Sequence, residues 1–160
     1  MSRGLKLMLL GVVILASFFR FFDLGNIPPG LYPDEAMNGN NALEALEGRD
    51  WKIFYSENNG REGLFINLQS LSLALFGNQA WALRLTSALF GVLTVIGIFF
   101  LTQILFHPLP YRYHVALLAS FFLAVSFWHI NFSRIGFRAI MAPFFLVWSL
   151  YFFLRFYKAF

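Results

Sequence analysis

The stretch LTSALFGVLTVIGIFFLTQILF, residues 85–106, decides the fold. It contains no formally charged residue, and as an α-helix it would be about 33 Å long. The hydrocarbon core of a bilayer is about 30 Å thick, so a helix of this length and composition can cross it. We therefore interpret residues 85–106 as a transmembrane helix.

Three further apolar stretches resemble this one, and they cover residues 5–24, 113–132 and 139–157. Of the whole chain, 59% of residues are hydrophobic and 12% are charged, whereas a soluble domain carries about 25% charged residues. The sequence therefore predicts an all-α, polytopic membrane protein with about four transmembrane helices. Arg3 and Lys6 favour a cytoplasmic N-terminus, and an even number of spans returns the chain to the same side.

Residues 25–84 then form a large first outer loop. Within it we expect a helix at 33–47, with a proline at its first position and a glycine after its last, lying on the membrane surface. Residues 64–76 predict a second helix about 20 Å long, too short to span, hence juxtamembrane or re-entrant. Lys and Arg counts are equal for four and five spans, so helix length favours four. Residues 54–63 are interpreted as a polar loop.

The charges are strongly segregated along the chain. All eight acidic residues lie between Asp23 and Glu62, with three basic residues among them, and the other nine basic residues lie in segments without any acid. A basic remainder suits a protein surrounded by anionic lipid. The basic residues form no stripe, so nucleic acid is not an expected partner. The absence of cysteine excludes disulfides and cysteine-ligated metals.

Two adjacent carboxylates, Asp34 and Glu35, follow the first span in the sequence YPDEAMNGNN, residues 32–41. They could cap the predicted helix, because acids in the first turn interact with its free N–H groups and dipole. Alternatively, a carboxylate at the membrane edge could act as a base or a metal ligand. Successive helical residues point about 100° apart, so only one of the two could face a site while the other orients it or faces solvent.

Arg134 and Arg138 are spaced to share one face of a helix, on the same side of the membrane as Asp34 in the four-span topology. They could anchor the protein to lipid phosphates or bind one specific phosphate as a fork. Arg61 and Glu62 could be a solvated ion pair of small energetic value. His129 belongs to no metal-binding spacing, and we interpret it as a packed or interfacial histidine.

Four segments occur in order across nearly the whole chain, and they read FRFFDLGNIPPGLYPDEAMNGNNALEAL, GREGLFINLQSLSLALFG, ALRLTSALFGVLTVIGIFFLTQILF and SFWHINFSRIGFRAIMAPFF. Taken together, they resemble the N-terminal part of bacterial membrane glycosyltransferases of the GT-C fold. This group is similar to dolichyl-phosphate-mannose protein mannosyltransferases and to aminoarabinose transferases that modify lipid A.

The resemblance implies a hexosyl- or pentosyltransferase that takes sugar from a polyprenyl-phosphate donor and inverts the anomeric centre. It implies a lipid, glycan or protein acceptor, and an active site on the outer face of a bacterial inner membrane. By the motif, Asp34 would be the catalytic base and Glu35 its neighbour. Arg138, Arg134 and Arg61 would bind the donor phosphate. No cofactor is certain, and a divalent cation remains an open alternative because arginine or a metal ion can stabilise a departing phosphate.

The same resemblance leaves other functions to be weighed. Members of the group are several times longer than this chain, so we expect a fragment or a truncated homologue. A non-enzymatic small membrane protein, acting as an assembly partner, is the alternative that a shortened chain favours. Half of a transporter is disfavoured, because no charged residue lies in the middle of a predicted span, where an ion path would need one.

Overall fold

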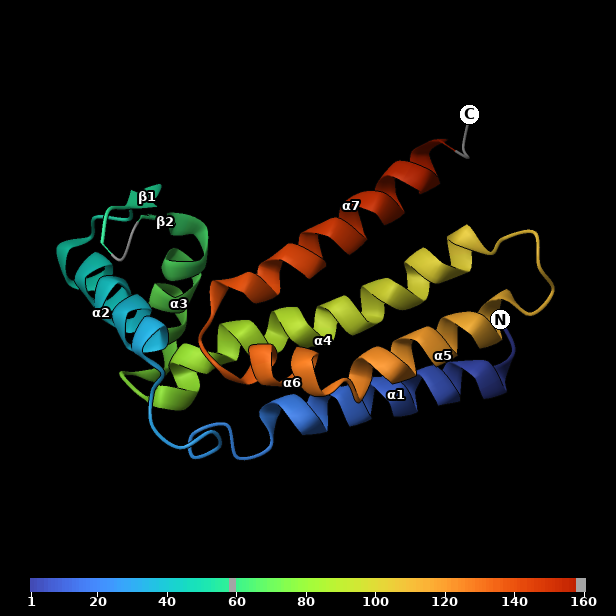
Figure 1. The fold of residues 1–160 in the computed structure, drawn as a ribbon, viewed down its shortest axis with the longest axis horizontal. Helices are drawn as coiled ribbons and strands as arrows, with labels where there is room; N and C mark the ends of the chain where they lie inside the picture. The colour runs from blue at the N-terminus through green and yellow to red at the C-terminus, as the bar shows by residue number, and fades with distance from the viewer. Residues whose placement is uncertain (58–59, 158–160) are drawn as a thin grey trace.

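A computed structural model describes residues 1–57 and 60–157, and it confirms an all-α polytopic membrane protein (Figure 1). By length and composition, three of its described helices can cross a membrane, or four if a bent pair counts as one span. The bundle consists of α1 (Arg3–Phe21), α4 (Ala80–Leu105), the bent pair α5 (Arg112–Ala124) and α6 (Phe127–Arg134), and α7 (Met141–Tyr157), which follows a short 3₁₀ turn, η1 (Arg138–Ile140).

Helix α4 is the centre of the bundle and packs against α1, α5, α6 and α7. Two glycines allow this close packing. A Cβ atom at Gly91 would overlap the Ser133 hydroxyl of α6, and one at Gly97 would lie 2.8 Å from Val147 of α7. Small residues at helix contacts let backbones approach closely inside membranes. The apolar stretch at residues 85–106 therefore also carries the packing surface for most of the bundle.

The stretch that is predicted as a span at residues 113–132 is bent in the structure. Helix α5 ends at Ala124, α6 begins at Phe127, and the two axes differ by 57°. Neither proline nor glycine occurs in this stretch. A guanidinium occupies the break instead: Arg20 of α1 donates to the carbonyls of Ala124 at 3.1 Å and Leu123 at 3.3 Å. A side chain that takes carbonyls out of the helical ladder is a known cause of kinks.

A smaller group of elements caps one end of the bundle. It consists of α2 (Pro33–Gly48), α3 (Gly63–Phe76) and an antiparallel ribbon in the segment that the sequence predicts as a plain polar loop, β1 (Phe54–Tyr55) with β2 (Arg61–Glu62). Figure 1 shows this group at the opposite end from the N-terminus and from the loop between α4 and α5. Gly63 is required where the ribbon meets α3, because a Cβ there would overlap the carbonyl oxygen of Lys52.

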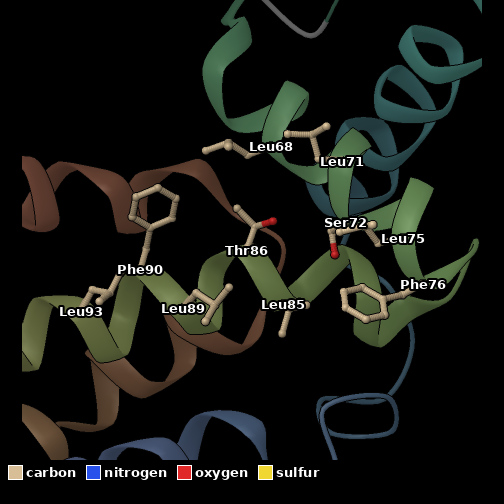
Figure 2. A pocket seen from close by; sticks show the side chains of 10 residues that line it. All are labelled: Leu68, Leu71, Ser72, Leu75, Phe76, Leu85, Thr86, Leu89, Phe90 and Leu93. Carbon is tan, nitrogen blue, oxygen red and sulfur yellow. The ribbon is translucent and has the colours of Figure 1, made fainter.

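Helix α3 packs against both α2 and α4, and it diverges from α4 along an apolar groove of about 350 Å³ (Figure 2). Leucine and phenylalanine side chains from the two helices line most of it. The Ser72 hydroxyl on this surface donates to the carbonyl of Ala82 at 2.6 Å, so it is already satisfied. The groove is therefore an apolar surface, and the polar chemistry of the chain lies elsewhere, where α2 meets η1.

Candidate functional site

Asp34 lies in the first turn of α2, where its side chain is half-buried. A carboxylate in this position is stabilised by the helix dipole and by the unpaired N–H groups of the first turn. It is also close enough to Arg61 to raise the pKa of that guanidinium. Asp34 is thus an acid at the edge of a basic cluster with part of its surface open.

Glu35 has the opposite environment, because its side chain has no exposed surface. Its Oε1 accepts from Nε of Arg84 at 2.7 Å and from the backbone N–H of Gly136 at 3.0 Å. Its Oε2 accepts from the N–H of Tyr32 at 3.2 Å and from Nη2 of Arg84 at 3.3 Å. A carboxylate enclosed in this way cannot touch a substrate. Of the two adjacent acids, Glu35 is therefore the enclosed one and Asp34 the one with exposed surface, in keeping with the roughly 100° between neighbouring helical side chains.

Arg84 is a residue of this region that sequence reasoning missed. Besides the ion pair with Glu35, its guanidinium donates to the carbonyls of Leu24 and Pro28, both at 3.0 Å, and to that of Gly30. It therefore fastens the segment between α1 and α2 to the first turns of α4. One signal was available: Arg84 is the single charged residue between Glu62 and Arg112 in an otherwise apolar sequence, and a buried charge in such a place needs a partner.

Arg61, on β2, is buried, with 2% of its area exposed. Its two terminal nitrogens donate to the side-chain oxygens of Asn38 and Asn41, both on α2. Burial lowers the pKa of Arg61, and the nearby Arg138 lowers it further, while Glu57 and Asp34 act in the opposite direction. Both terminal nitrogens of Arg61 are therefore engaged by α2, and its positive charge contributes to the electrostatic potential of the site.

Arg138 is the accessible cation of the cluster. It opens η1 and pairs with Glu62, and about a third of its side chain, 32%, is exposed. An ion pair this exposed is worth little to the fold. An anionic ligand can therefore compete with Glu62 for the guanidinium at small energetic cost. The structure thus brings Asp34, Arg61 and Arg138 together from three separate elements.

Arg134 is not part of this accessible cluster. Its guanidinium donates to the carbonyls of Phe19 and Phe22, both at 2.7 Å, and Ile27 at 2.8 Å, and only 7% of the residue is exposed. The expected shared helical face with Arg138 does not form, because α6 ends at Arg134 itself and the backbone is extended before η1 begins. The Arg134 guanidinium therefore caps the C-terminal end of α1.

His129, on α6, is half-buried and contacts Arg20 of α1. Arg20 Nη2 contacts its Nδ1 at 2.8 Å, and since arginine only donates, Nδ1 must be the acceptor. Within residues 1–57 and 60–157, no group of three or more His, Asp or Glu side chains is arranged to hold a metal ion.

Residues 64–159 match the model of a protein family described as dolichyl-phosphate-mannose-protein mannosyltransferase. The match runs from the first turn of α3 to residue 159, so it includes Arg84, Arg134 and Arg138. Asp34 and Arg61 lie before it. No curated protein and no solved structure matches the chain.

Proposed function

Because the chain belongs to the dolichyl-phosphate-mannose-protein mannosyltransferase family, and is thus a membrane glycosyltransferase of the GT-C type, we propose that it moves a sugar from a polyprenyl-phosphate donor to an acceptor hydroxyl with inversion. Asp34 is the general base of this reaction. Arg138 binds the donor phosphate, and the buried Arg61 adds positive charge to the same site. Glu35 and Arg134 hold these residues in place without touching substrate.

A single displacement requires only the groups that this site provides. As the acceptor oxygen bonds to the anomeric carbon, its proton passes to the Asp34 carboxylate. The bond between the anomeric carbon and the phosphate oxygen breaks, and the phosphate leaves with the electron pair. The guanidinium of Arg138 stabilises the negative charge that develops there. A second carboxylate nucleophile is needed for retention of configuration but not for inversion, so the enclosure of Glu35 is compatible with the chemistry.

One observation carries the proposal: a half-buried acid and an accessible arginine, about a hundred residues apart in sequence, lie in one electrostatic cluster. Arg61 lies between them, since it donates to Asn38 on the helix of Asp34, and the next residue, Glu62, pairs with Arg138. Both Asp34 and Arg138 also affect the pKa of Arg61. Isolated acids and arginines on a membrane protein surface are common, but their convergence at one end of the bundle supports a binding site for an anionic leaving group.

We further propose that this end of the bundle faces away from the cytoplasm. Arg3 and Lys6 lie in the first turn of α1, at the opposite end of the bundle (Figure 1). The Lys and Arg bias at the first span usually sets the orientation, with the basic end in the cytoplasm. The donor and its lipid, glycan or protein acceptor would then meet at the outer surface, where the isoprenoid chain of the donor remains in the bilayer.

The test is the Asp34→Asn variant of the intact protein, reconstituted in vesicles with a radiolabelled polyprenyl-phosphate sugar. Loss of a general base predicts a rate at least about 100-fold lower at unchanged protein level. Glu44→Gln, which removes an exposed carboxylate from the same helix, is the matched control and should retain activity. Normal turnover by Asp34→Asn would dismiss Asp34 as the base.

A further inference from the structure

Both backbone polar groups of Gly136 are held by one helix. The Gly136 N–H donates to Oε1 of Glu35 at 3.0 Å, and the Gly136 carbonyl accepts from Nδ2 of Asn38, also at 3.0 Å. Glu35 and Asn38 lie three residues apart on α2, so they occupy neighbouring positions on the same face. Both side chains and Gly136 itself are buried.

The space around Gly136 is closed to any larger residue. A Cβ atom there would lie 2.9 Å from Nε2 of Gln69 and 3.0 Å from Cγ of Glu35. The backbone of this loop therefore approaches α2 closely, because Gly136 has no side chain to separate them.

Glu35 and Asn38, which contact Gly136, each accept a hydrogen bond from a buried arginine. Arg84 forms the buried ion pair with Glu35, and Arg61 donates to the side-chain oxygen of Asn38. Both oxygens of Glu35 and both polar atoms of the Asn38 amide have partners. Displacement of either side chain would leave these polar groups unpaired in a low dielectric. The positions of Glu35 and Asn38 are thus fixed by α4 and the ribbon as well as by α2.

We propose that Glu35 and Asn38 form a clamp on Gly136 whose function is to set the position of Arg138 relative to Asp34. The two clamp residues share a helix with Asp34, and Gly136 precedes Arg138 by two residues. The clamp is therefore the short connection between the proposed base and the proposed phosphate ligand. Glu35 and Asn38 are positioning residues in this inference, which rests on the proposed function.

The test uses the isosteric variant Asn38→Asp. It removes the N–H donor to the Gly136 carbonyl but keeps an oxygen that can accept from Arg61. Asn41→Asp is the matched control, because it also places a carboxylate against Arg61 and does not touch Gly136. The donor that Asn41→Asp removes faces Glu57 at 3.4 Å, outside the clamp. The two variants therefore share the added charge, and only Asn38→Asp removes a contact with Gly136.

Two measurements are made on each variant. The chain has no cysteine, so spin labels at Asn40→Cys and Ala139→Cys, both exposed positions, report the distance between α2 and η1. Steady-state kinetics then give kcat and the KM for the polyprenyl-phosphate donor. In Asn38→Asp we expect a broader distance distribution and a donor KM about tenfold higher, the size of change that follows from one lost buried hydrogen bond. In Asn41→Asp we expect a change below about threefold.

An unchanged distance distribution in Asn38→Asp would overturn the clamp. A broadened distribution with an unchanged donor KM would overturn the link to Arg138, while the separate Asp34→Asn result still decides the proposed base. If Asn38→Asp does not fold, as judged by size-exclusion chromatography, Gly136→Ala is used instead. Its new methyl group opens the clamp from the other side and is expected to produce the same pair of changes, and their absence would count against the inference equally.

Discussion

Arg84 and Arg20 are both completely buried, but the two regions that contain them satisfy the charge in different ways. At the junction of α2 and α4, Arg84 meets the carboxylate of Glu35. Between α1 and the bent pair, Arg20 donates to the carbonyls of Ala16, Ala124 and Leu123 and to His129. The segregation of acids explains the difference, because the segments forming the bundle interior contain none.

The comparison shows two ways to place arginine inside a membrane protein. A carboxylate neutralises the charge of the arginine, but it destabilises the fold if the arginine is lost, because a buried charge then has no counter-ion. Backbone carbonyls at a helix C-terminus provide acceptors and a favourable dipole, and the helix has to break to make them available. The first arrangement should therefore be the more sensitive to substitution, and the following predictions test this in decreasing order of effect.

Arg84→Met should have the largest effect, because it leaves Glu35 charged, buried and unpaired. We expect the free energy of unfolding to fall by about 3–5 kcal/mol, measured by chemical denaturation in detergent micelles. The double variant Arg84→Met with Glu35→Met should recover much of this loss, since apolar pairs can replace buried ion pairs. A double variant as unstable as the single one would show that the carbonyl contacts of Arg84 matter more than its ion pair.

Gly91→Ala should have the next largest effect and disturb the Arg20 region directly. The added methyl would overlap the Ser133 hydroxyl and lie 2.9 Å from Nε of Arg20, so α4 must move away from α6 and α1. Overpacking of this kind costs about 1–3 kcal/mol, readable as a lower midpoint in the same denaturation experiment. Gly11→Ala is the control, because a Cβ there meets no atom within 4 Å, and it should be neutral or slightly stabilising.

Arg20→Lys should destabilise by about 1 kcal/mol. Lysine keeps the charge but lacks the planar fork that reaches Ala124 and Leu123 together, and one net hydrogen bond is worth about 1 kcal/mol. Unfolding curves give the change in stability, and spin labels on α5 and α6 give the change in the bend angle. A loss as large as that of Arg84→Met would contradict the distinction between the two regions.

Asp50→Asn should have the smallest effect on the free energy of unfolding. It measures how much a solvent-exposed ion pair contributes to stability in this protein. Asp50 and Lys52 are separated by 3.9 Å, with 71% and 46% of their side chains exposed. We expect a change below about 0.5 kcal/mol, and one that disappears in high salt because exposed charges are screened. A salt-independent loss would indicate that Asp50 has a role beyond this pair.

Sequence alone was sufficient for the features that depend on hydrophobic length and periodicity. The uncharged run at 85–106 and the run near the N-terminus predict helices that the structure contains, and the resemblance to the GT-C group is confirmed by the family match. The break between α5 and α6 could not be predicted, because its cause is Arg20, about a hundred residues away. No local propensity signals a kink made by a distant side chain.

The site was only partly predictable for the same reason. The four-span topology places Asp34 and Arg138 at one end of the bundle, and helical geometry allows only one of two adjacent acids to face a site. Which acid is enclosed depends on Arg84 and Gly136, two positions that no local motif marks. Likewise, the spacing of Arg134 and Arg138 predicts a shared face only if one helix continues through both, and α6 ends between them.

The central place of α4 has a consequence for biogenesis. Chains are synthesised from the N-terminus, so α1, α2, α3 and the ribbon are all made before α4. Helices α1 and α3 pack against α4, and Ala82 and Leu83 of α4 share a hydrophobic cluster with residues of α2 and β1. Until Arg84 leaves the ribosome, Glu35 has no cation to enclose it and must remain hydrated at the membrane surface. Assembly of the outer elements is therefore a late event, and nascent chains arrested before residue 84 should display Glu35 to water-soluble reagents.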